Sequence, residues 1–391
     1  MRILSRSFVV LVLMALMVSA SAGRADGPEN ITPLLLDVQD APVPFMGSDG
    51  RVHLVYELWM TNFSSADISV EKVEVLSADV VLQSLNAAAI AGRLQAAGLR
   101  EPAGKLGGSV QALLFLHVTL APGAAIPTHL SHRVTIHASA ASPGWQDITE
   151  SGGEITVARQ PVVSIGPPLH GEGYISADSC CDASRHTRAA LPINGRVWVA
   201  QRYAVDWEEL DAQGRVYVGD REKLESYTIF GKPVIAVADG VVLSATDGLP
   251  EQTPGKYPTN ISLEEADGNS VILDLGELHY ATYAHMQPGT IQVRVGQRVR
   301  QGQLLGLVGN SGNSIAPHLH FQVNDRPSSF ASNGLPYEIK DFQITGESPG
   351  TKAFDEAEEN GTPLVVTPIA PAQQVKSALP LDQLIISFKA K

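Results

Sequence analysis

The chain has 391 residues, a formal net charge of −13 at pH 7 and 18% charged residues. It is long enough for two domains, and its acidic balance disfavours nucleic acid and anionic membrane surfaces as partners. Its two cysteines, Cys180 and Cys181, are adjacent, which excludes a disulfide-rich scaffold. Such a pair can form a disulfide, remain as thiols or bind a metal, and we expect a local structural pair.

The N-terminus is typical of an export signal. Arg2 and Arg6 precede an apolar run over residues 8–18, which is too short to span a bilayer, and residues 20–22 read Ala-Ser-Ala, a small-residue cleavage site. We therefore predict a signal peptide over residues 1–22, cleaved after Ala22, and a secreted or periplasmic protein. A retained membrane anchor is the alternative. The later chain has no run of 18 apolar residues, so stable membrane insertion after cleavage is not expected.

Residues 23–165 have the pattern of a β-sandwich-like domain. Runs of strand-forming residues are separated by turn formers, and an Ala/Leu-rich stretch at 84–99 could hold one short helix. The predicted strands cover residues 53–60, 68–76, 110–120 and 132–138. This part shows no titratable cluster that resembles a catalytic site. Its expected role is that of a spacer, a docking module or a cover for the second domain.

A Pro/Gly-rich boundary leads into a second strand-rich domain at residues 173–340. Its predicted strands cover residues 197–205, 233–238, 241–245, 270–275, 280–283, 292–295, 304–308 and 318–323. Residues 341–391 form a C-terminal tail whose strand-like run, 384–388, should dock on a sheet. The sequence thus predicts an all-β protein.

Several residues of the second domain could carry chemistry. His318 and His320 are two apart in a predicted strand, so both imidazoles project from one face, and neutral imidazole is a common zinc ligand. His285 follows another predicted strand. Asp206 sits among apolar residues, where a carboxylate needs a partner or a metal. Glycine-rich turns, including residues 309–314, fix the strand register around such a site.

These motifs occur in a characteristic order: the segment with Asp206, then Tyr283-Ala284-His285, then a Gly-Asn-Ser-Gly turn at 309–312, then His-Leu-His-Phe at 318–321. Together they resemble the lysostaphin/LytM-type zinc metalloendopeptidase family over roughly residues 186–337. The resemblance implies a lysostaphin-type antiparallel β-domain with a zinc groove. It also implies hydrolysis of peptide bonds in peptidoglycan cross-links or stem peptides.

The same resemblance implies roles for individual residues. Asp206 and His320 would be zinc ligands. His318 would be the general base, and His285 would help to bind the developing oxyanion. Glu208, Glu209 and their acidic neighbours are interpreted instead as a solvated stretch.

One position departs from the family pattern. The first zinc-binding histidine of the family falls on Arg202, which cannot coordinate a metal. A hairpin turn at Asn194-Gly195 would place His186 opposite Tyr203, and a single bulge would turn it to the face of Asp206. His186 is therefore our predicted third ligand. Further candidates are Cys180, Cys181 and Asp182.

Two other interpretations remain open. In one, nothing replaces the missing ligand and Arg202 pairs with Asp206. By resemblance, such a degenerate module would bind or activate cell-wall hydrolases. Independently of this choice, the N-terminal domain is a candidate docking site for other cell-wall enzymes. In the other, the protein is a zinc peptidase whose substrates are Gly-rich extracellular proteins. The joint presence of His285, His318, His320 and Asp206 favours a zinc enzyme.

Overall fold

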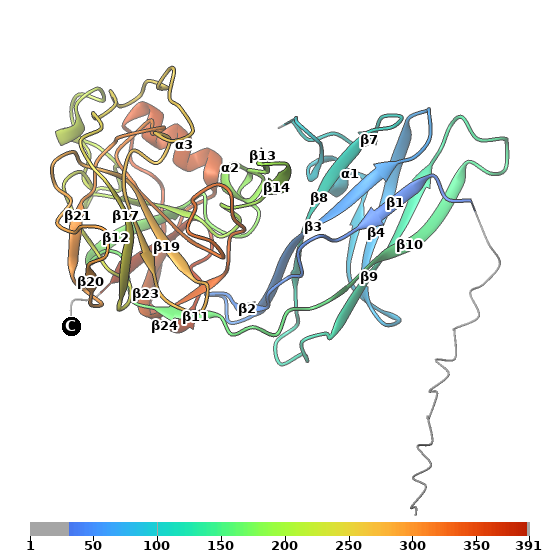
Figure 1. The fold of residues 1–391 in the computed structure, drawn as a ribbon, viewed down its shortest axis with the longest axis horizontal. Coiled ribbons are helices and arrows are strands. Elements are labelled where there is room, and N and C mark those ends of the chain that lie inside the picture. Colours follow the sequence, from blue (N-terminus) through green and yellow to red (C-terminus); the bar gives the residue numbers. More distant parts are fainter. Residues whose placement is uncertain (1–30, 100, 389–391) are drawn as a thin grey trace, which may run out of the picture. The chain divides into compact units, whose positions relative to one another are not determined.

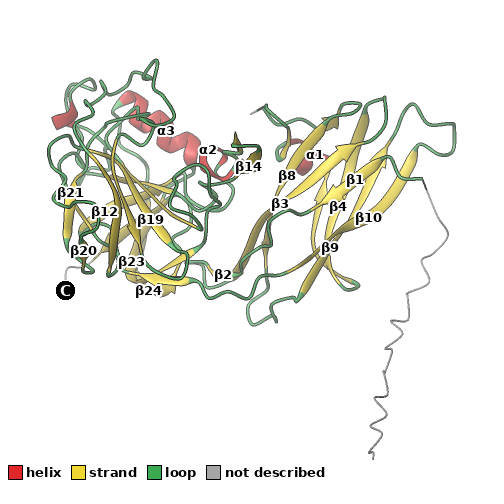
Figure 2. Ribbon diagram, in the orientation of Figure 1, coloured by secondary structure: helices red, strands yellow, loops and turns green. Residues whose placement is uncertain are grey.

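Strands make up most of the regular structure in the computed structural model, which describes residues 31–99 and 101–388 (Figure 2). The prediction of a mostly β protein is confirmed. The predicted export signal lies outside the described residues. None of the helices in the described part has the length and apolarity that crossing a membrane requires. The predicted domain boundaries stay predictions.

The first module, residues 33–157, contains two sheets, each of five strands within the described residues. One sheet has the order β1-β3-β8-β6, with β2 paired to β3, and the other has the order β10-β9-β4-β5, with β7 paired to β4. The strands of the first sheet are β1 (Leu34–Asp37), β2 (Phe45–Met46), β3 (Val52–Asn62), β6 (Leu94–Ala96) and β8 (Gln111–Thr119). Those of the second are β4 (Ile68–Ser77), β5 (Val80–Asn86), β7 (Lys105–Leu106), β9 (His129–His137) and β10 (Asp147–Thr156). A short helix, α1 (Ala87–Ala91), follows β5, and the Asn86 side chain caps its start.

Strand β3 is buried on both faces, which explains why most of its residues are apolar. Its residues 54, 56, 58 and 60 pack into the core that the two sheets of the first module share. Val55 packs instead with residues of the second module, and Trp59 belongs to a small cluster against which Ala190 and Val197 pack. Because alternate residues of a strand face opposite sides, β3 belongs to two cores at once.

The second module, residues 163–388, is built around a sheet of eleven strands within the described residues (Figure 1). Its order is β11-β23-β25-β12-β15-β22-β19-β18-β17-β20, with β24 paired to β23, and β11 and β23 are its parallel pair. The strands are β11 (Val163–Ile165), β12 (Gly171–Ala177), β15 (Val205–Glu209), β17 (Gly240–Thr246), β18 (Asn269–Asp274), β19 (Tyr280–Met286), β20 (Arg298–Val299), β22 (Leu319–Asn324), β23 (Tyr337–Glu347), β24 (Thr367–Ala378) and β25 (Leu384–Phe388).

Smaller elements complete this module. Two short strand pairs, β13 (Leu191–Ile193) with β14 (Arg196–Trp198) and β16 (Pro233–Ile235) with β21 (Leu304–Leu307), lie outside the large sheet. The helices are α2 (Ser184–Thr187), the 3-10 helix η1 (Leu224–Ser226) and α3 (Thr351–Asn360). Strand β25 is hydrogen-bonded between β12 and β23, so the C-terminal segment forms an interior strand of the sheet.

Two strand predictions in this module were wrong. The segment 197–205 is not one strand: β14 ends at Trp198, and the chain turns before β15 begins at Val205. Residues 292–295 form no strand, although Val293 is buried in the core. In both cases the apolar residues are buried, but a segment can be buried without forming the hydrogen bonds of a β-strand.

Candidate metal centre

Two neighbouring strands bring the predicted ligands together. Strands β15 and β22 are antiparallel, with Asp206 directly opposite His320. The Nδ1 atom of His320 lies 2.9 Å from Oδ1 of Asp206. His318, immediately before β22, places its Nε2 atom 3.4 Å from the same carboxylate oxygen. Adjacent strands therefore place two of the singled-out imidazoles beside the Asp206 carboxylate.

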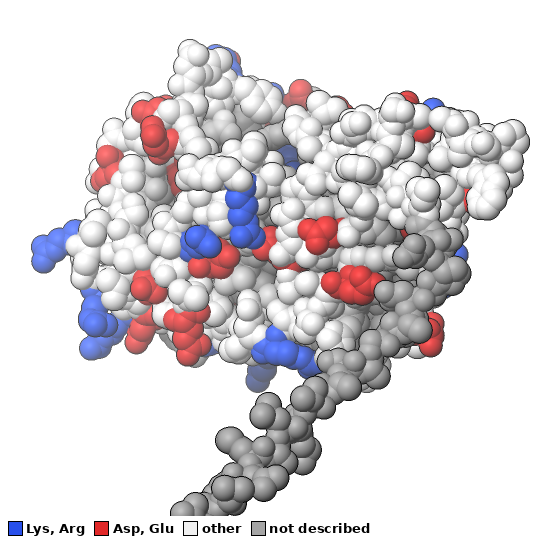
Figure 3. All heavy atoms as spheres, turned by 45° about the vertical axis from the view of Figure 1, so that its right-hand side comes forward, with Lys and Arg blue, Asp and Glu red and all other residues white. Residues whose placement is uncertain are grey.

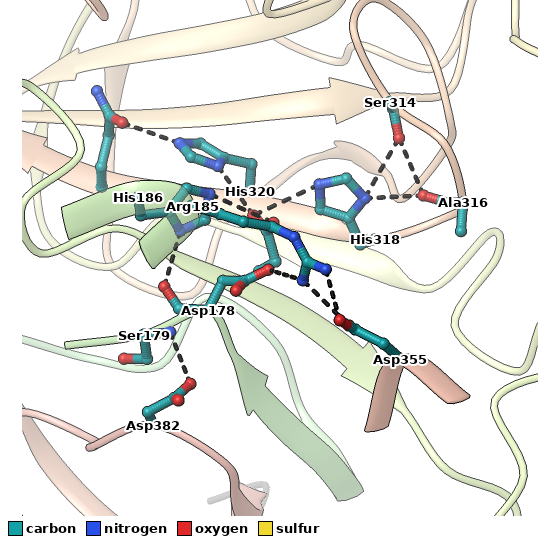
Figure 4. A network of polar contacts seen from close by, with 12 residues as sticks. Asp178, Ser179, Arg185, His186, Ser314, Ala316, His318, His320, Asp355 and Asp382 are labelled. Carbon is teal, nitrogen blue, oxygen red and sulfur yellow. Dashed lines mark hydrogen bonds and ion pairs between the residues drawn. The ribbon is translucent and has the colours of Figure 1, made fainter. Parts of the chain in front are cut away.

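His186 reaches this carboxylate from outside the sheet. It lies on α2, and its Nε2 atom is 3.4 Å from Oδ2 of Asp206. Its Nδ1–H donates a hydrogen bond to the backbone carbonyl of Asp178, at 2.9 Å, which turns Nε2 toward the site (Figure 4). His186, Asp206 and His320 each offer one ligand atom, and these atoms lie within 4.8 Å of one another.

The route by which His186 arrives differs from the predicted one. The hairpin at Asn194-Gly195 exists in the predicted register, with Leu191 opposite Trp198. It ends there, however, so His186 is not paired with Tyr203. A helical turn carries His186 to the site in place of a bulged strand, because the ladder is too short to reach it.

The hydrogen bonds of His320 select the nitrogen that can bind a metal. Its Nε2–H donates to Oε1 of Gln322 at 2.9 Å. The amide orientation of Gln322 is itself fixed, because its Nε2 donates to Asn324 Oδ1 and to the carbonyl of Ser329. Nδ1 of His320 therefore carries the free lone pair and faces Asp206. Second partners of this kind commonly orient metal-binding histidines.

The other two histidines are held in a similar way. His318 donates from Nδ1 to the carbonyl of Ala316, and His285 donates from Nδ1 to the carbonyl of Ser311, each at 2.8 Å. Both rings therefore present an unprotonated Nε2, and their centroids are 4.7 Å apart. Burial, together with His318 and His320, lowers the pKa of His285 well below its usual range. His285 has a φ of 61°, a backbone conformation uncommon for a residue with a side chain.

The electrostatics of the cluster suit a bound cation. Burial acts to raise the pKa of Asp206, but His186 and His318 hold it well below its usual value. Burial likewise acts to lower the pKa of His186, yet the Asp206 carboxylate outweighs it and raises that pKa to about 9. The buried carboxylate thus demands positive charge beside it. Two imidazoles and one carboxylate are a donor set that Zn²⁺ accepts, and the cation would supply this charge.

The other candidate ligands are engaged elsewhere, and the predicted pairing of Arg202 with Asp206 is absent from the described residues. Cys180 and Cys181 form a disulfide with each other, and Asp182 pairs with Arg93 and His117. Arg202 does not pair with Asp206. It forms a buried bidentate ion pair with Glu57 of β3, at 2.6 and 2.9 Å.

Sequence reasoning missed several residues near the site. Glu208 and Glu209 are buried, so their interpretation as a solvated stretch was wrong. Burial and the neighbouring Glu358 raise the pKa of Glu208 well above its usual value. Glu208 and Gln322 lie two residues after Asp206 and His320, so strand alternation alone could have placed them on the same face. With the histidines, Glu208 lines a cleft of about 820 Å³ that α3 borders through Glu358.

The family model of peptidase family M23 matches residues 226–332, which include His285, His318 and His320. The chain carries an M23 peptidase domain. The family predicted from the motifs is thereby confirmed for this part of the chain. Asp206 and His186 precede the matched segment but meet it in space at the candidate metal centre.

Curated relatives align with the M23 domain and its surroundings. The chain is 32% identical over 121 residues to glycyl-glycine endopeptidase ALE-1 of Staphylococcus capitis, covering 30% of this chain and 29% of that protein. It is 28% identical over 203 residues to peptidoglycan DD-endopeptidase ShyA of Vibrio cholerae, covering 47% and 42%. It is 35% identical over 109 residues to lysostaphin of Staphylococcus simulans, covering 27% and 19%. The chain thus spans less than half of the length of each of these relatives.

Solved structures of M23 proteins were also found. The catalytic domain of lysostaphin from Staphylococcus simulans shares 23% identity, with 42% of this chain and 88% of that chain covered and a TM-score of 0.23. A zinc-containing peptidase from Vibrio cholerae shares 16% identity, with 75% and 83% covered and a TM-score of 0.26.

Proposed function

We propose that this chain is an exported zinc metalloendopeptidase that hydrolyses peptide bonds of peptidoglycan, in cross-links or stem peptides. The proposal rests on one observation above all. Nε2 of His186 and Nδ1 of His320, the ring nitrogens that no other hydrogen bond engages, converge on the Asp206 carboxylate, with two further imidazole nitrogens beside them. His186, Asp206 and His320 would hold the metal.

The chain's own groups supply the rest of the chemistry. When bound, Zn²⁺ would lower the pKa of a water molecule and polarise the scissile carbonyl. His318 can accept the proton of that water at Nε2, because its Nδ1–H is engaged by Ala316. His285 presents the same tautomer, so it accepts a hydrogen bond when neutral. It can donate to a developing oxyanion only after Nε2 is protonated.

The substrate class is taken from the relatives. Two of them are named as a glycyl-glycine endopeptidase and a peptidoglycan DD-endopeptidase, and both names describe cleavage of peptide bonds. Such a substrate lies outside the cytoplasm, which agrees with the predicted export signal. Docking of other cell-wall enzymes on the first module remains part of this proposal.

The test combines metal content with activity. Purified protein should carry about one Zn²⁺ per chain and release peptide amines from isolated peptidoglycan. His318→Ala should keep the metal and lose activity by about 10²-fold or more, because general-base catalysis contributes that much. A Gly-rich protein assayed in parallel identifies the alternative substrate. If no transition metal is bound and none can be loaded, hydrolysis is wrong and a recognition role replaces it.

A further inference from the structure

A second group of metal-binding side chains lies away from the proposed catalytic centre. His53 of β3, His117 of β8 and Cys181 of the loop before α2 each offer one ligand atom, and these atoms lie within 4.8 Å of one another. In the β3–β8 ladder His117 is opposite Val55, two residues from His53, so both imidazoles project from one face. The proposed hydrolysis uses none of the three.

The two imidazoles meet edge to edge. Nδ1 of His53 lies 2.8 Å from Nε2 of His117. The ring centroids are 5.1 Å apart and the ring planes differ by 26°, so the rings are nearly coplanar with these two nitrogens between them.

Carboxylates occupy the outer nitrogen of each ring. His53 donates from Nε2 to Asp49, and His117 donates from Nδ1 to Asp182, each at 2.9 Å. A neutral imidazole has a single N–H, so both nitrogens that face each other carry lone pairs. Thr119 Oγ1 is 3.4 and 3.3 Å from them and can donate its hydrogen to only one. With these tautomers, an additional proton or a metal cation between the rings would satisfy both lone pairs.

The outer partners of the two rings are of the kind that metal-binding histidines have. A carboxylate that accepts the second N–H of a histidine fixes the tautomer and the ring orientation for a metal, and here it occurs twice. Zinc–nitrogen bonds of 2.0–2.1 Å at a tetrahedral angle require the nitrogens to be about 3.3 Å apart. Binding zinc would therefore require the nitrogens to separate by about half an ångström from the observed 2.8 Å, and both rings to tilt so that their lone pairs meet at the metal.

The third ligand depends on redox state. Cys181 is bonded to Cys180, and a disulfide sulfur is a poor ligand, because the thiolate is the species that binds metal. We propose that His53, His117 and Cys181 form a second, redox-gated binding site for Zn²⁺, completed when the Cys180–Cys181 disulfide is reduced. A dithiol reductant would supply two electrons and two protons, leaving as its own disulfide. The Cys181 thiol would then release its proton to solvent as the sulfur–zinc bond forms.

Occupation of this site would join the two modules. His53 and His117 belong to the first module, and Cys181 lies five residues before His186 in the second. The cation would tie the ligand-bearing loop to β3 and β8. The site is independent of the proposed hydrolysis, because it shares no ligand with the catalytic centre.

Cobalt(II) is the probe, because a cobalt–thiolate bond has a charge-transfer absorption that histidine and carboxylate ligands lack. The disulfide form should take up one equivalent of cobalt without this band. After reduction with a phosphine, it should take up a second equivalent with the band. Reduced protein that binds no additional cobalt, or binds it without the band, overturns the proposal.

Variants separate this site from the catalytic centre. Cys180→Ser leaves Cys181 as a free thiol and should show the band without reductant, provided that circular dichroism confirms its fold. His117→Ala should lose the second equivalent and keep the first, whereas His129→Ala, at an exposed position of β9, should keep both. A band that persists in His117→Ala contradicts the assignment. If the disulfide form of the unaltered protein binds no cobalt but the reduced form binds one equivalent with the band, the proposed catalytic site is wrong and this proposal stands.

Discussion

At the scale of single residues, the chemistry depends on which nitrogen of each histidine is free. Backbone carbonyls engage Nδ1 of His186, His285 and His318, whereas Gln322 engages Nε2 of His320. These partners are fixed by the fold, so each imidazole is oriented before any metal arrives. Such preorganisation lowers the cost of binding a cation.

Replacing His186 tests whether it is the third ligand. His186→Ala should weaken zinc binding by more than about 100-fold, because the loss of an orienting partner alone commonly costs 10- to 100-fold. Competition with a chromophoric chelator measures the affinity. His170→Ala, at an exposed position, is the control. Full stoichiometric zinc in purified His186→Ala would show that His186 is not a ligand.

Glu150 makes stability depend on pH in the first module. It is buried on β10, and burial raises its pKa to about 7, although the backbone N–H of Leu34 donates to it. The folded protein therefore binds more protons than the unfolded chain between about pH 4.5 and pH 7. Stability should fall as pH rises through this window, by up to about 3 kcal/mol.

Glu150→Gln removes this titration and keeps the acceptor for Leu34. Urea unfolding at pH 5 and pH 8 should show a smaller loss of stability in the variant than in the unaltered protein. Glu154→Gln, at an exposed position on the same strand, should behave like the unaltered protein. An equal pH dependence in Glu150→Gln would contradict the assignment.

At the scale of elements, α2 has only four residues and depends on its surroundings to present His186. Its loop is anchored to the first module by Arg93, which pairs with Asp182, and by Arg188, which donates to the carbonyl of Gly92. Arg185 pairs with Asp178 and with Asp355 of α3 (Figure 4). Helices this short are not stable alone, so these contacts hold His186 in place.

Arg93→Ala tests this anchoring. Loosening the loop should reduce zinc affinity by roughly 10-fold, which corresponds to about 1.4 kcal/mol of ordering that binding must then supply. Chelator competition at fixed pH measures the change. Arg133→Ala, which removes an ion pair to Glu74 within the first module, should leave the affinity unaltered. An unchanged affinity in Arg93→Ala would mean that the loop is held by other contacts.

At the scale of the whole molecule, the two modules share buried contacts. Phe45 and Val55 pack in the core of the second module, and Phe45 meets Tyr203 edge to face with centroids 5.4 Å apart. The buried Arg202–Glu57 pair lies in the same region. On the face in Figure 3, Lys and Arg side chains are interspersed with Asp and Glu. They form no contiguous basic patch there, and such a patch is the feature typical of nucleic-acid-binding proteins.

Removing one member of the Arg202–Glu57 ion pair should destabilise the protein more than replacing both members. Glu57→Gln leaves a buried guanidinium without its counter-charge and should destabilise the protein by about 3–5 kcal/mol, measured by urea unfolding. The double replacement Glu57→Leu with Arg202→Leu should recover most of this loss, because a buried pair and an apolar pair are often similar in stability. Glu71→Gln, exposed on β4, is the control. A Glu57→Gln protein as stable as the original would contradict this account.

Local pattern was sufficient for much of this protein. Strand alternation predicted the mostly β class, the shared face of His318 and His320, and the hairpin register at Asn194-Gly195. The ordered motifs around His285 and His320 predicted the M23 domain. These features depend on residues close in sequence, whose geometry the backbone repeat determines.

Only the tertiary structure decided how the site is assembled. Glu57 and Arg202 are 145 residues apart, so their pairing, which removes Arg202 from the site, has no local signature. His186 was chosen from sequence by an incorrect route, because its approach depends on contacts between α2 and distant segments. The burial of Glu208 also depends on α3, far along the chain. Local sequence determines which way a side chain points from its own strand, but long-range packing determines what it meets there.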